Sequence, residues 1–527
     1  MATVHEELLA TRTNGILMPV SAMKTEQDWG VGDFSSLCQW IEFLGGLGTK
    51  IIQILPLQET APGQNCPYSA LSAFAIDPVY IDVNQVREVN LSPSVRRLVH
   101  DMQGDIAAWR LSHKAAFKPV KDAKLKVLWQ AYQFFLENEM ANSSPEYHAF
   151  EAYCNLNKSW LRNYAIFRAL KDFYRWQTWQ DWPNGLNEFK KEAVDAFEAK
   201  YKEYVDFFAY VQWQADMQLR NAKVCAQKAG IFLFGDIPFG TNLDSAEVWS
   251  ERENFRLDYS VGAPADQFSD KGQCWGLPAY DWDYIQANNF NLWRRKIHRA
   301  VELYDLFRLD HLVGFYRTYV FAPGDEKGAF DVQDEQAQID RGYRFLSMVL
   351  EAAHGAMPVG EDLGVIPNYV RRMLVDLKIA GYKVLRWERE DNGYYREPRS
   401  YPLVSLATTS THDTETVRGW WETMPQYERA NMWEMITAQK TDGNVPFDLN
   451  TQKAIFHRVL TSGSALTMFS WQDIIGTLDR INVPGTVGEE NWTYRSPYTP
   501  AEALEVYRAQ LDAYEELLKQ TQRAKNV

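Results

Sequence analysis

The sequence has few cysteines, no excess of positive charge and no long apolar run. Its five cysteines include no CxxC pair, a distribution typical of reduced thiols in the cytosol and without a zinc-binding spacing. The net charge of −14 argues against nucleic acid as a partner, because phosphate binding needs a basic face. No segment approaches the roughly 18 apolar residues of a membrane span. Glu6 and Glu7 interrupt the place where a signal peptide would have its apolar core. We therefore expect a cytoplasmic protein without a nucleic-acid or membrane partner.

Three acidic residues in the second half of the chain each follow an apolar run. Asp310, Glu361 and Asp413 succeed one another at intervals of about fifty residues, which is room for a strand, a crossover helix and a long loop. In a barrel of parallel strands, residues at the carboxyl ends of the strands meet on one face. We therefore predict an α/β fold, a (β/α)8 TIM barrel with large, mainly helical insertions.

The barrel is predicted to occupy residues 1–527 as a single catalytic unit with one helical interruption. We place the first barrel strand at residues 50–56, a helix before it at 33–47 and a second short strand at 79–83. Helical patterns dominate from about 84 to 229. We interpret that stretch as an insertion, because a run typical of a barrel strand, ending in Asp236, follows it.

Residues 240–290 show little periodicity and many turn formers, so we predict a long active-site loop region there. The remaining strands are predicted near residues 307, 359, 384, 406 and 468, and a C-terminal helix near 500–520.

The paired acids suit glycosyl transfer with retention of configuration. That reaction needs a carboxylate nucleophile and a protonated carboxylic acid about 5–5.5 Å apart, roles that Asp310 and the longer Glu361 could take. Arg308 lies two residues before Asp310 on the predicted strand, so both side chains point to one face, and its charge would keep Asp310 ionised. A carboxylate after a strand is often only a helix N-cap, but that explanation does not readily cover four strand-end acids at once.

Further polar and aromatic residues fit the same interpretation. Asp413 would bind sugar hydroxyls without moving a proton, and His311 and His412 could donate to hydroxyls of the same ring. The chain is rich in aromatic residues (14%), whose rings stack on the apolar faces of sugars. Most of these rings serve the core. Trp275 is a candidate for sugar binding because it lies within the predicted loop region, and core packing is the alternative.

The chain also carries an ordered series of motifs, and with them it resembles the amylomaltase or disproportionating-enzyme family. These are the 4-alpha-glucanotransferases of glycoside hydrolase family 77. The resemblance extends from Gly15 to Trp492. Its motifs are Gln53–Leu57, Pro67–Ser69, Gly235–Pro238, Asp244–Trp249, Gly272–Gly276, Phe307–His311, Gly360–Gly364, Thr411–Asp413 and Asn482–Thr486.

The resemblance implies roles for individual residues. Asp310 falls on the nucleophile, Glu361 on the acid/base and Asp413 on the transition-state stabiliser. The implied substrate-binding residues are Tyr68, Asp236, Arg308, His311 and His412 around the reacting glucose, with Trp275 and Asn482 on the flanking glucan. The implied reaction moves α-1,4-glucan segments from maltodextrin, starch or glycogen to glucose or another glucan, without a cofactor or metal.

Some positions depart from the family pattern. Met18–Ser21 replaces a His-Pro-Thr-Ser stretch, Asn65-Cys66 replaces Asp-Ser, Leu277 replaces Asn, and Thr414–Thr416 replaces Asn-Asp-Thr. None of these changes removes a catalytic group. Subsite geometry and chain-length preference stay open.

Other functions have to be weighed against transfer. An α-glucan hydrolase would use the same carboxylates with water as acceptor, and the predicted loop region favours transfer because it would cover the site. Retention of all three acids argues against an inactive glucan-binding scaffold. A metal-dependent hydrolase lacks HxH and HExxH spacings. The oligomeric state is left open by the sequence.

Overall fold

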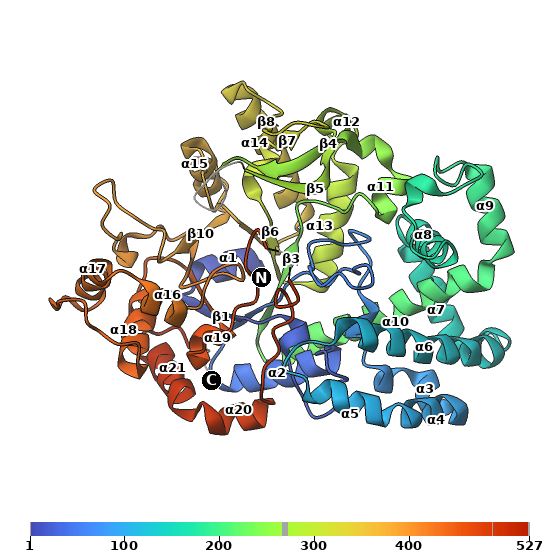
Figure 1. Ribbon diagram of the computed structural model, residues 1–527, viewed down its shortest axis with the longest axis horizontal. Coiled ribbons are helices and arrows are strands. Elements are labelled where there is room, and N and C mark those ends of the chain that lie inside the picture. Colours follow the sequence, from blue (N-terminus) through green and yellow to red (C-terminus); the bar gives the residue numbers. More distant parts are fainter. Residues whose placement is uncertain (1, 266–271, 487, 525–527) are drawn as a thin grey trace.

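A closed barrel of parallel strands forms the centre of the protein (Figure 1). The structure is a computed structural model that describes residues 2–265, 272–486 and 488–524. Around the barrel the order is β1-β12-β11-β10-β9-β6-β3-β2. These strands are β1 (Thr13–Leu17), β2 (Ile51–Gln53), β3 (Phe232–Ile237), β6 (Leu306–Leu309), β9 (Met357–Gly360), β10 (Ala380–Val384), β11 (Ser405–Thr408) and β12 (Leu466–Ser470). The predicted (β/α)8 barrel is confirmed.

The first barrel strand is not the one predicted. β1, with the sequence TNGIL, precedes the run at residues 50–56, which supplies the second strand instead. Asn and Gly are poor strand formers, but tertiary contacts require both here. Asn14 donates from its buried amide to the carbonyl of Arg523 at 2.6 Å. A Cβ at Gly15 would lie 2.3 Å from the sulfur of Met468 on the neighbouring strand.

The short strand predicted at residues 79–83 is also wrong. Two 3-10 turns, Pro78–Tyr80 and Val83–Gln85, occupy that segment. The side chain of Asp77 accepts from the backbone of Val79, and that of Asp82 accepts from the backbone of Asn84. These local bonds satisfy the backbone in place of a strand partner. The strands predicted near 307, 359, 384, 406 and 468 are confirmed.

Side chains alternate between the inside and the outside of the barrel strands. Phe234 and Leu306 belong to a cluster inside the barrel, which also contains Leu8 of α1 (Val4–Ala10). Two residues further along, β3 and β6 point Asp236 and Arg308 to the same side, and these two residues are register partners. The barrel is therefore filled with apolar side chains toward its amino-terminal end and presents polar ones at its carboxyl end.

Helices fill the connection between β2 and β3. They are α3 (Arg87–Leu91), α4 (Pro93–Asp101), α5 (Gln103–Leu111), α6 (Phe117–Phe135), α7 (Pro145–Leu156), α8 (Leu161–Phe173), α9 (Lys191–Lys200) and α10 (Lys202–Lys228). Buried ion pairs join this group to the loop after β2. Arg168 lies 2.9 Å from Glu59, and Lys121 lies 2.5 Å from Asp77.

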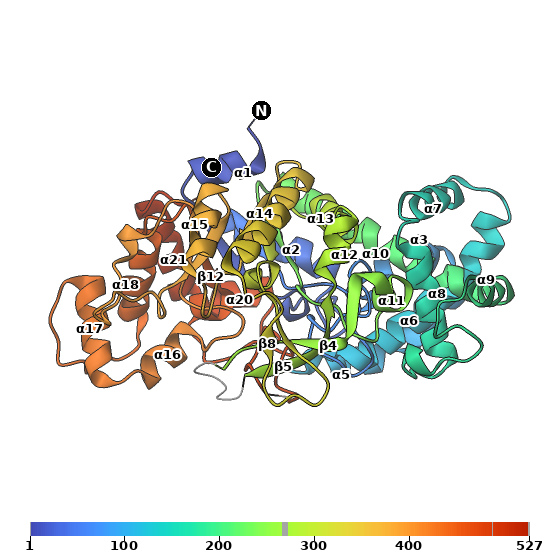
Figure 2. The same ribbon diagram turned by 90° about the horizontal axis from the view of Figure 1, so that it is seen from above.

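The remaining helices cover the barrel on its other sides. They are α2 (Phe34–Gly46), α13 (Asn291–Leu303), α14 (Glu335–Ala352), α15 (Asn368–Asp376), α16 (Val417–Thr423), α17 (Gln426–Thr437), α18 (Leu449–Leu460), α19 (Trp471–Ile475), α20 (Pro500–Val506) and α21 (Arg508–Gln520). Figure 2 shows α6–α9 on one flank of the molecule and α16–α18 on the other. No helix in the described part of the chain has both the length and the apolar character that crossing a membrane requires.

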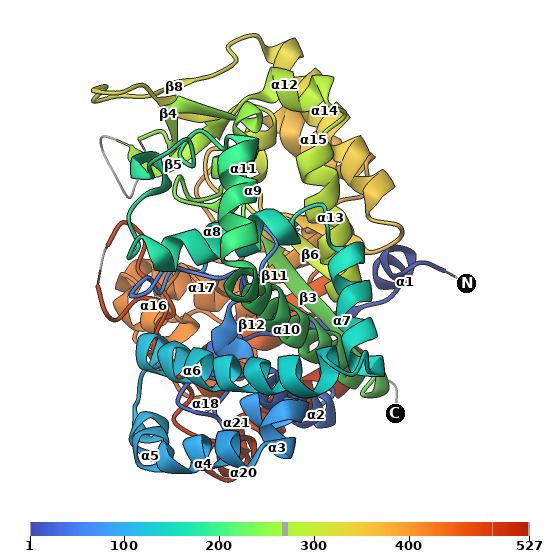
Figure 3. The ribbon, with the colours of Figure 1, turned by 90° about the vertical axis from the view of Figure 1, so that its right-hand side faces the viewer.

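The stretch 240–290 is not the loop that its sequence predicted. It contains α11 (Ala246–Ser250), β4 (Phe255–Ala263), β5 (Gln273–Tyr280) and α12 (Trp282–Ala287), while residues 266–271 lie outside the described chain. With β7 (Tyr319–Phe321) and β8 (Ala329–Phe330), these strands form a sheet in the order β5-β4-β7-β8. Much of β4 and β5 is exposed, so the apolar alternation of a half-buried strand is missing. Figure 3 shows this sheet at the opposite end of the molecule from α1.

Candidate active site

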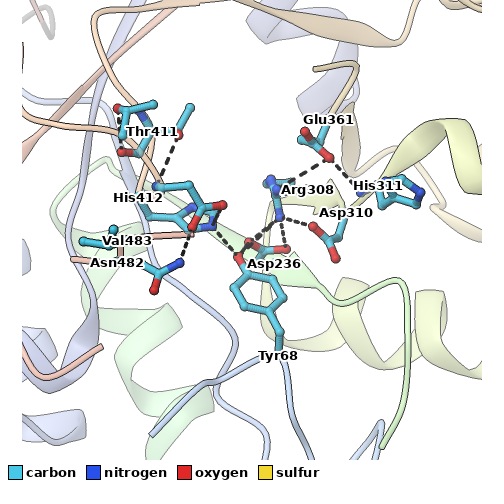
Figure 4. Close-up of polar contacts among 12 residues, drawn as sticks. Tyr68, Asp236, Arg308, Asp310, His311, Glu361, Thr411, His412, Asn482 and Val483 are labelled. Carbon is cyan, nitrogen blue, oxygen red and sulfur yellow. Dashed lines mark hydrogen bonds and ion pairs between the residues drawn. The ribbon is translucent and has the colours of Figure 1, made fainter. Parts of the chain in front are cut away.

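The predicted site residues meet at the carboxyl ends of the barrel strands. Asp236 belongs to β3 and Arg308 to β6, whereas Asp310 and Glu361 directly follow β6 and β9. The loops after β2, β11 and β12 supply the other members, Tyr68, His412, Asp413 and Asn482. Figure 4 shows Asp236, Asp310, Glu361 and Tyr68 around Arg308, with His412 and Asn482 on one side and His311 on the other.

Arg308 is the centre of the site's electrostatics. Its Nη1 lies 3.0 Å from both carboxylate oxygens of Asp236 and 2.9 Å from Oδ1 of Asp310. Its Nη2 lies 3.8 Å from Oε2 of Glu361. Burial alone would lower the pKa of Arg308, but these carboxylates, Asp236 first among them, raise it well above its ordinary value. One permanent cation therefore contacts both members of the predicted catalytic pair.

The backbone fixes Asp310 from two sides. The amide of Phe239, just beyond β3, donates to Oδ2 of Asp310 at 3.1 Å. The next residue in the chain, His311, has a left-handed backbone with φ of 46°. Such conformations cost about 1–3 kcal/mol and persist where the surroundings impose them. Asp310 is thus held with one oxygen bonded to Arg308 and the other to the main chain.

The pKa of Glu361 is raised by its surroundings. Loss of solvent is the main cause that raises its pKa to about 8, and the negative charge of Asp310 acts in the same direction. Arg308 and the backbone amide of His311, which donates to Oε2 at 2.9 Å, oppose the shift without cancelling it. A carboxylic acid that stays protonated near neutral pH can act as a general acid.

The pKa of Asp413 is shifted in the opposite direction, below its ordinary value. Burial by itself would raise its pKa, but the His412 ring and hydrogen bonds from His412 and Asn482 lower it to about 2. Nε2 of His412 lies 3.2 Å from Oδ2 of Asp413, and the amide of Asn482 donates to Oδ1 at 2.7 Å. Asp413 is therefore an ionised acceptor at all ordinary pH values.

Tyr68 links the carboxylates around Arg308 to His412 and Asp413. Its hydroxyl donates to Asp236 at 2.7 Å and lies 3.3 Å from Nε2 of His412. Burial is the largest cause that raises the pKa values of both Tyr68 and Asp236. The charge of Asp236 raises the pKa of Tyr68 further, whereas the hydrogen bond from Tyr68 lowers that of Asp236. A chain of polar contacts thus runs from Glu361 through Arg308, Asp236 and Tyr68 to the Asp413 side.

Trp275 lies at the edge of this group. The residue belongs to β5, is 36% exposed and packs edge-on against the ring of His311 at 4.9 Å between centroids. Its exposure excludes the core-packing alternative.

His311, beside Trp275, is uncharged over most of the pH range. Removal from solvent lowers the pKa of His311 to about 4, so the imidazole is neutral above that pH.

Two contributors were not among the predicted site residues. One is Phe239, which acts through its backbone amide. Every residue except proline has this group, so the residue type could not reveal it. Trp492 lies with its ring centroid 5.6 Å from that of Tyr68 and 5.8 Å from that of His412. Trp492 ends the stretch over which the sequence resembles the family, and that position was the available signal. In the described residues, no three His, Cys, Asp or Glu side chains gather as a metal site requires.

Comparisons with known proteins identify relatives of this chain. The profile of the 4-alpha-glucanotransferase family matches residues 18–499. The 4-alpha-glucanotransferase of Thermus thermophilus is 31% identical over 496 residues, covering 90% of this chain and 93% of the relative. That of Chlamydia caviae is 29% identical over 494 residues, covering 92% of this chain and 90% of the relative.

Solved structures show the same fold. The amylomaltase from Streptococcus agalactiae, in complex with acarbose, matches with a TM-score of 0.82 and 24% identity, over 98% of this chain and 100% of that one. The amylomaltase from Corynebacterium glutamicum matches with a TM-score of 0.81 and 20% identity, over 97% of this chain and 76% of that one. Since the family profile spans most of its length, this chain belongs to the 4-alpha-glucanotransferases of glycoside hydrolase family 77.

Proposed function

We propose that this 4-alpha-glucanotransferase works with retention through a covalent glycosyl–Asp310 intermediate, with Glu361 as acid and base. One observation carries the proposal. The carboxylates of Asp310 and Glu361 lie 2.9 and 3.8 Å from the same guanidinium, while the pKa of Glu361 is raised to about 8 by loss of solvent. A retaining mechanism requires two adjacent carboxyl groups, one of which can give a proton to the leaving group near neutral pH.

In the first step an oxygen of Asp310 attacks the anomeric carbon of an α-1,4-glucan. The bond to the leaving glucan breaks, and Glu361 gives its proton to the departing oxygen. In the second step the 4-hydroxyl of glucose or another glucan attacks the same carbon. Glu361, now a carboxylate, takes the proton of that hydroxyl, and the ester bond to Asp310 breaks.

Asp413 serves the transition state of both steps. Ionised and held by His412 and Asn482, it accepts hydrogen bonds from hydroxyls of the reacting sugar, which strengthen as positive charge develops on the ring. Tyr68, Asp236, Arg308 and His311 bind the same sugar. Trp275 and Asn482 contact the flanking glucan.

We assign the acceptor side to the segment 240–290. Its strand β5 carries the exposed ring of Trp275 beside His311, so an incoming glucan could stack there and displace water. This favours transfer over hydrolysis, in which water would be the acceptor. Maltodextrin, starch or glycogen would be donors, and glucose or dextrins acceptors.

Incubation with maltotriose tests the proposal. Products are separated by chromatography while reducing ends are measured in the same samples. Transfer forms glucose together with longer dextrins and no net gain of reducing ends. A rise of reducing ends in step with consumption of maltotriose would identify a hydrolase, and no change in maltotriose would refute both activities.

A further inference from the structure

Arg480 joins two loops of the active site by their main chains. It lies beyond β12, and its Nη2 donates to the carbonyl of Asp413 at 3.1 Å. Its Nε donates to the carbonyl of Asn482 at 3.3 Å. The third branch, Nη1, lies 3.4 Å from Oε1 of Glu415. The planar guanidinium of Arg480 therefore bridges the loops after β11 and β12. It does so at Asp413 and Asn482, whose side chains also hydrogen-bond to each other.

A second arginine, Arg386, binds Glu415 and so helps to hold Arg480 in place. Nη1 of Arg386 donates to Oε2 of Glu415 at 2.7 Å, and its Nη2 donates to the carbonyl of Glu415, also at 2.7 Å. Arg386 is buried, and its guanidinium lies 5.0 Å from the ring of Trp420. Burial acts to raise the pKa of Glu415, but its backbone hydrogen bond and the two arginines lower it. Glu415 is thus an ionised anchor that orients Arg480.

The geometry of Asp413 depends on these main-chain bonds. The side chain of Asp413 is 42% exposed, so packing alone does not fix it. Its Oδ1 accepts from the Asn482 amide at 2.7 Å, and the backbone amide of Asn482 donates to the carbonyl of His412 at 3.1 Å. Arg480 adds the two hydrogen bonds that set the spacing between the carbonyls of Asp413 and Asn482.

We propose that Arg480, oriented by Glu415 and Arg386, is a positioning residue that aligns Asp413 and Asn482 for the transition state. The inference rests on the proposed function of Asp413. The hydrogen bonds of Arg480 go to main-chain carbonyls and to Glu415, so it acts through its neighbours and not on the sugar directly. A misplacement of about 1 Å at a reacting group can cost about 100-fold in rate.

Substitutions of Arg480 test this inference. Arg480→Ala should lower kcat for maltotriose transfer by about 10- to 100-fold while KM changes by less than about threefold, because the interaction matters most in the transition state. Arg480→Lys should recover little, since a point charge cannot donate in a fork to both carbonyls. Glu415→Gln should fall between Arg480→Ala and the wild type.

Two measurements separate positioning from general instability. Added guanidinium ion at millimolar concentration should restore part of the kcat of Arg480→Ala, whereas a poorly folded variant would gain nothing. In a double-mutant cycle, Arg480→Ala should cost much less in an Asn482→Ala background, because both changes disturb the same pair. Arg396→Ala is the matched control: this arginine is 41% exposed, lies 3.3 Å from Glu390 and should keep wild-type kcat.

Wild-type kcat in Arg480→Ala would overturn the inference. So would full recovery in Arg480→Lys, which would indicate a role for charge alone, or a loss that guanidinium does not rescue and that follows the melting temperature. Asp413→Asn is measured in parallel. If Asp413→Asn is inactive and Arg480→Ala is normal, only this inference fails. If Asp413→Asn turns over normally, the proposed function of Asp413 fails, and this inference with it.

Discussion

The guanidinium of Arg308 contacts three carboxylates, yet their chemistry differs. Asp236 is buried and paired closely, Asp310 has one oxygen on Arg308 and one on the amide of Phe239, and Glu361 is more distant at 3.8 Å. Loss of solvent raises the pKa of Glu361, and the more distant guanidinium of Arg308 opposes the shift without cancelling it. The pKa of Asp413 is lowered instead, because His412 and Asn482 hydrogen-bond to its carboxylate.

Replacing Asp310 by Asn tests its role as nucleophile. Asn is nearly isosteric but cannot form the glycosyl ester, so we expect transfer to fall by at least about 1,000-fold, a size typical of losing a covalent catalyst. The circular dichroism spectrum and melting temperature are the controls for folding. Wild-type-like turnover in a sample free of deamidated protein would remove Asp310 from this role.

The raised pKa of Glu361 predicts a pH dependence. Because the acid form is the active one at the start of the reaction, kcat/KM for maltotriose should decline as pH rises through about 8. An ordinary glutamate, with a pKa of about 4.3, would lose this activity far lower on the pH scale. Initial rates across pH 5 to 10 measure the effect, within the range where the melting temperature is constant.

A glycosyl fluoride donor supplies the control for this prediction. Its leaving group needs no proton, so its alkaline decline should be weaker, and Glu361→Gln should spare it more than maltotriose. An equal loss on both donors in Glu361→Gln would contradict an acid role in leaving-group departure.

Among the secondary-structure elements, the loops after β11 and β12 are joined by hydrogen bonds. Asp473 in α19 accepts from the hydroxyls of Thr409 and Ser410 at 2.6 and 2.5 Å and from the backbone amide of Val417 at 2.6 Å. This carboxylate holds the start and the end of the loop that carries Asp413. The small sheet approaches from the other side and brings its strand β5, with Trp275, beside His311.

Trp275→Ala tests the role of that strand in acceptor binding. If the ring stacks the incoming sugar, its loss should lower transfer more than hydrolysis, by several-fold given about 1 kcal/mol for such a contact. The ratio of transferred glucan to new reducing ends is the measurement. Tyr343→Ala, which removes a ring that is 55% exposed on α14, is the control. An unchanged ratio in Trp275→Ala would refute acceptor stacking.

At the scale of the whole molecule, Arg523 ties the segment after α21 to the barrel. Its guanidinium is fully buried and donates to five main-chain carbonyls, those of Thr13, Leu460, Ser462, Ser464 and Ala465. Thr13 begins β1, and Ala465 directly precedes β12, so this side chain helps to hold the two strands where the chain closes the barrel.

Arg523→Met should therefore destabilise the protein strongly. The change removes five buried hydrogen bonds, while the carbonyls of Thr13, Leu460, Ser462 and Ala465 each keep a second donor. At about 1 kcal/mol for each lost bond, we expect a loss of more than about 3 kcal/mol in the free energy of unfolding. Urea unfolding followed by circular dichroism measures it. Lys519→Met removes a cation that is 67% exposed and paired with Glu515, and it should stay within about 0.5 kcal/mol of the wild type. Equal stability of the two variants would contradict the role of Arg523.

Local patterns in the amino-acid sequence predicted several parts of the protein correctly. Apolar runs ending in acids located β3, β6, β9 and β11, because barrel strands are short, buried and followed by polar loops. Helical periodicity located α2 and the helices between β2 and β3. The motifs around Asp310, Glu361 and Asp413 indicated the family and the side chains that the structure brings together.

Other features depend on contacts between residues far apart in the chain, so no local pattern could predict them. β1 is a strand because Asn14 and Gly15 fit partners hundreds of residues away, and β4 and β5 are exposed strands that lack the usual alternation. The protonation of Glu361 depends on Arg308, Asp310 and loss of solvent, none of which a linear pattern measures. Arg480 hydrogen-bonds to main-chain carbonyls. Every residue has such a carbonyl, so the sequence does not show which ones Arg480 will bind.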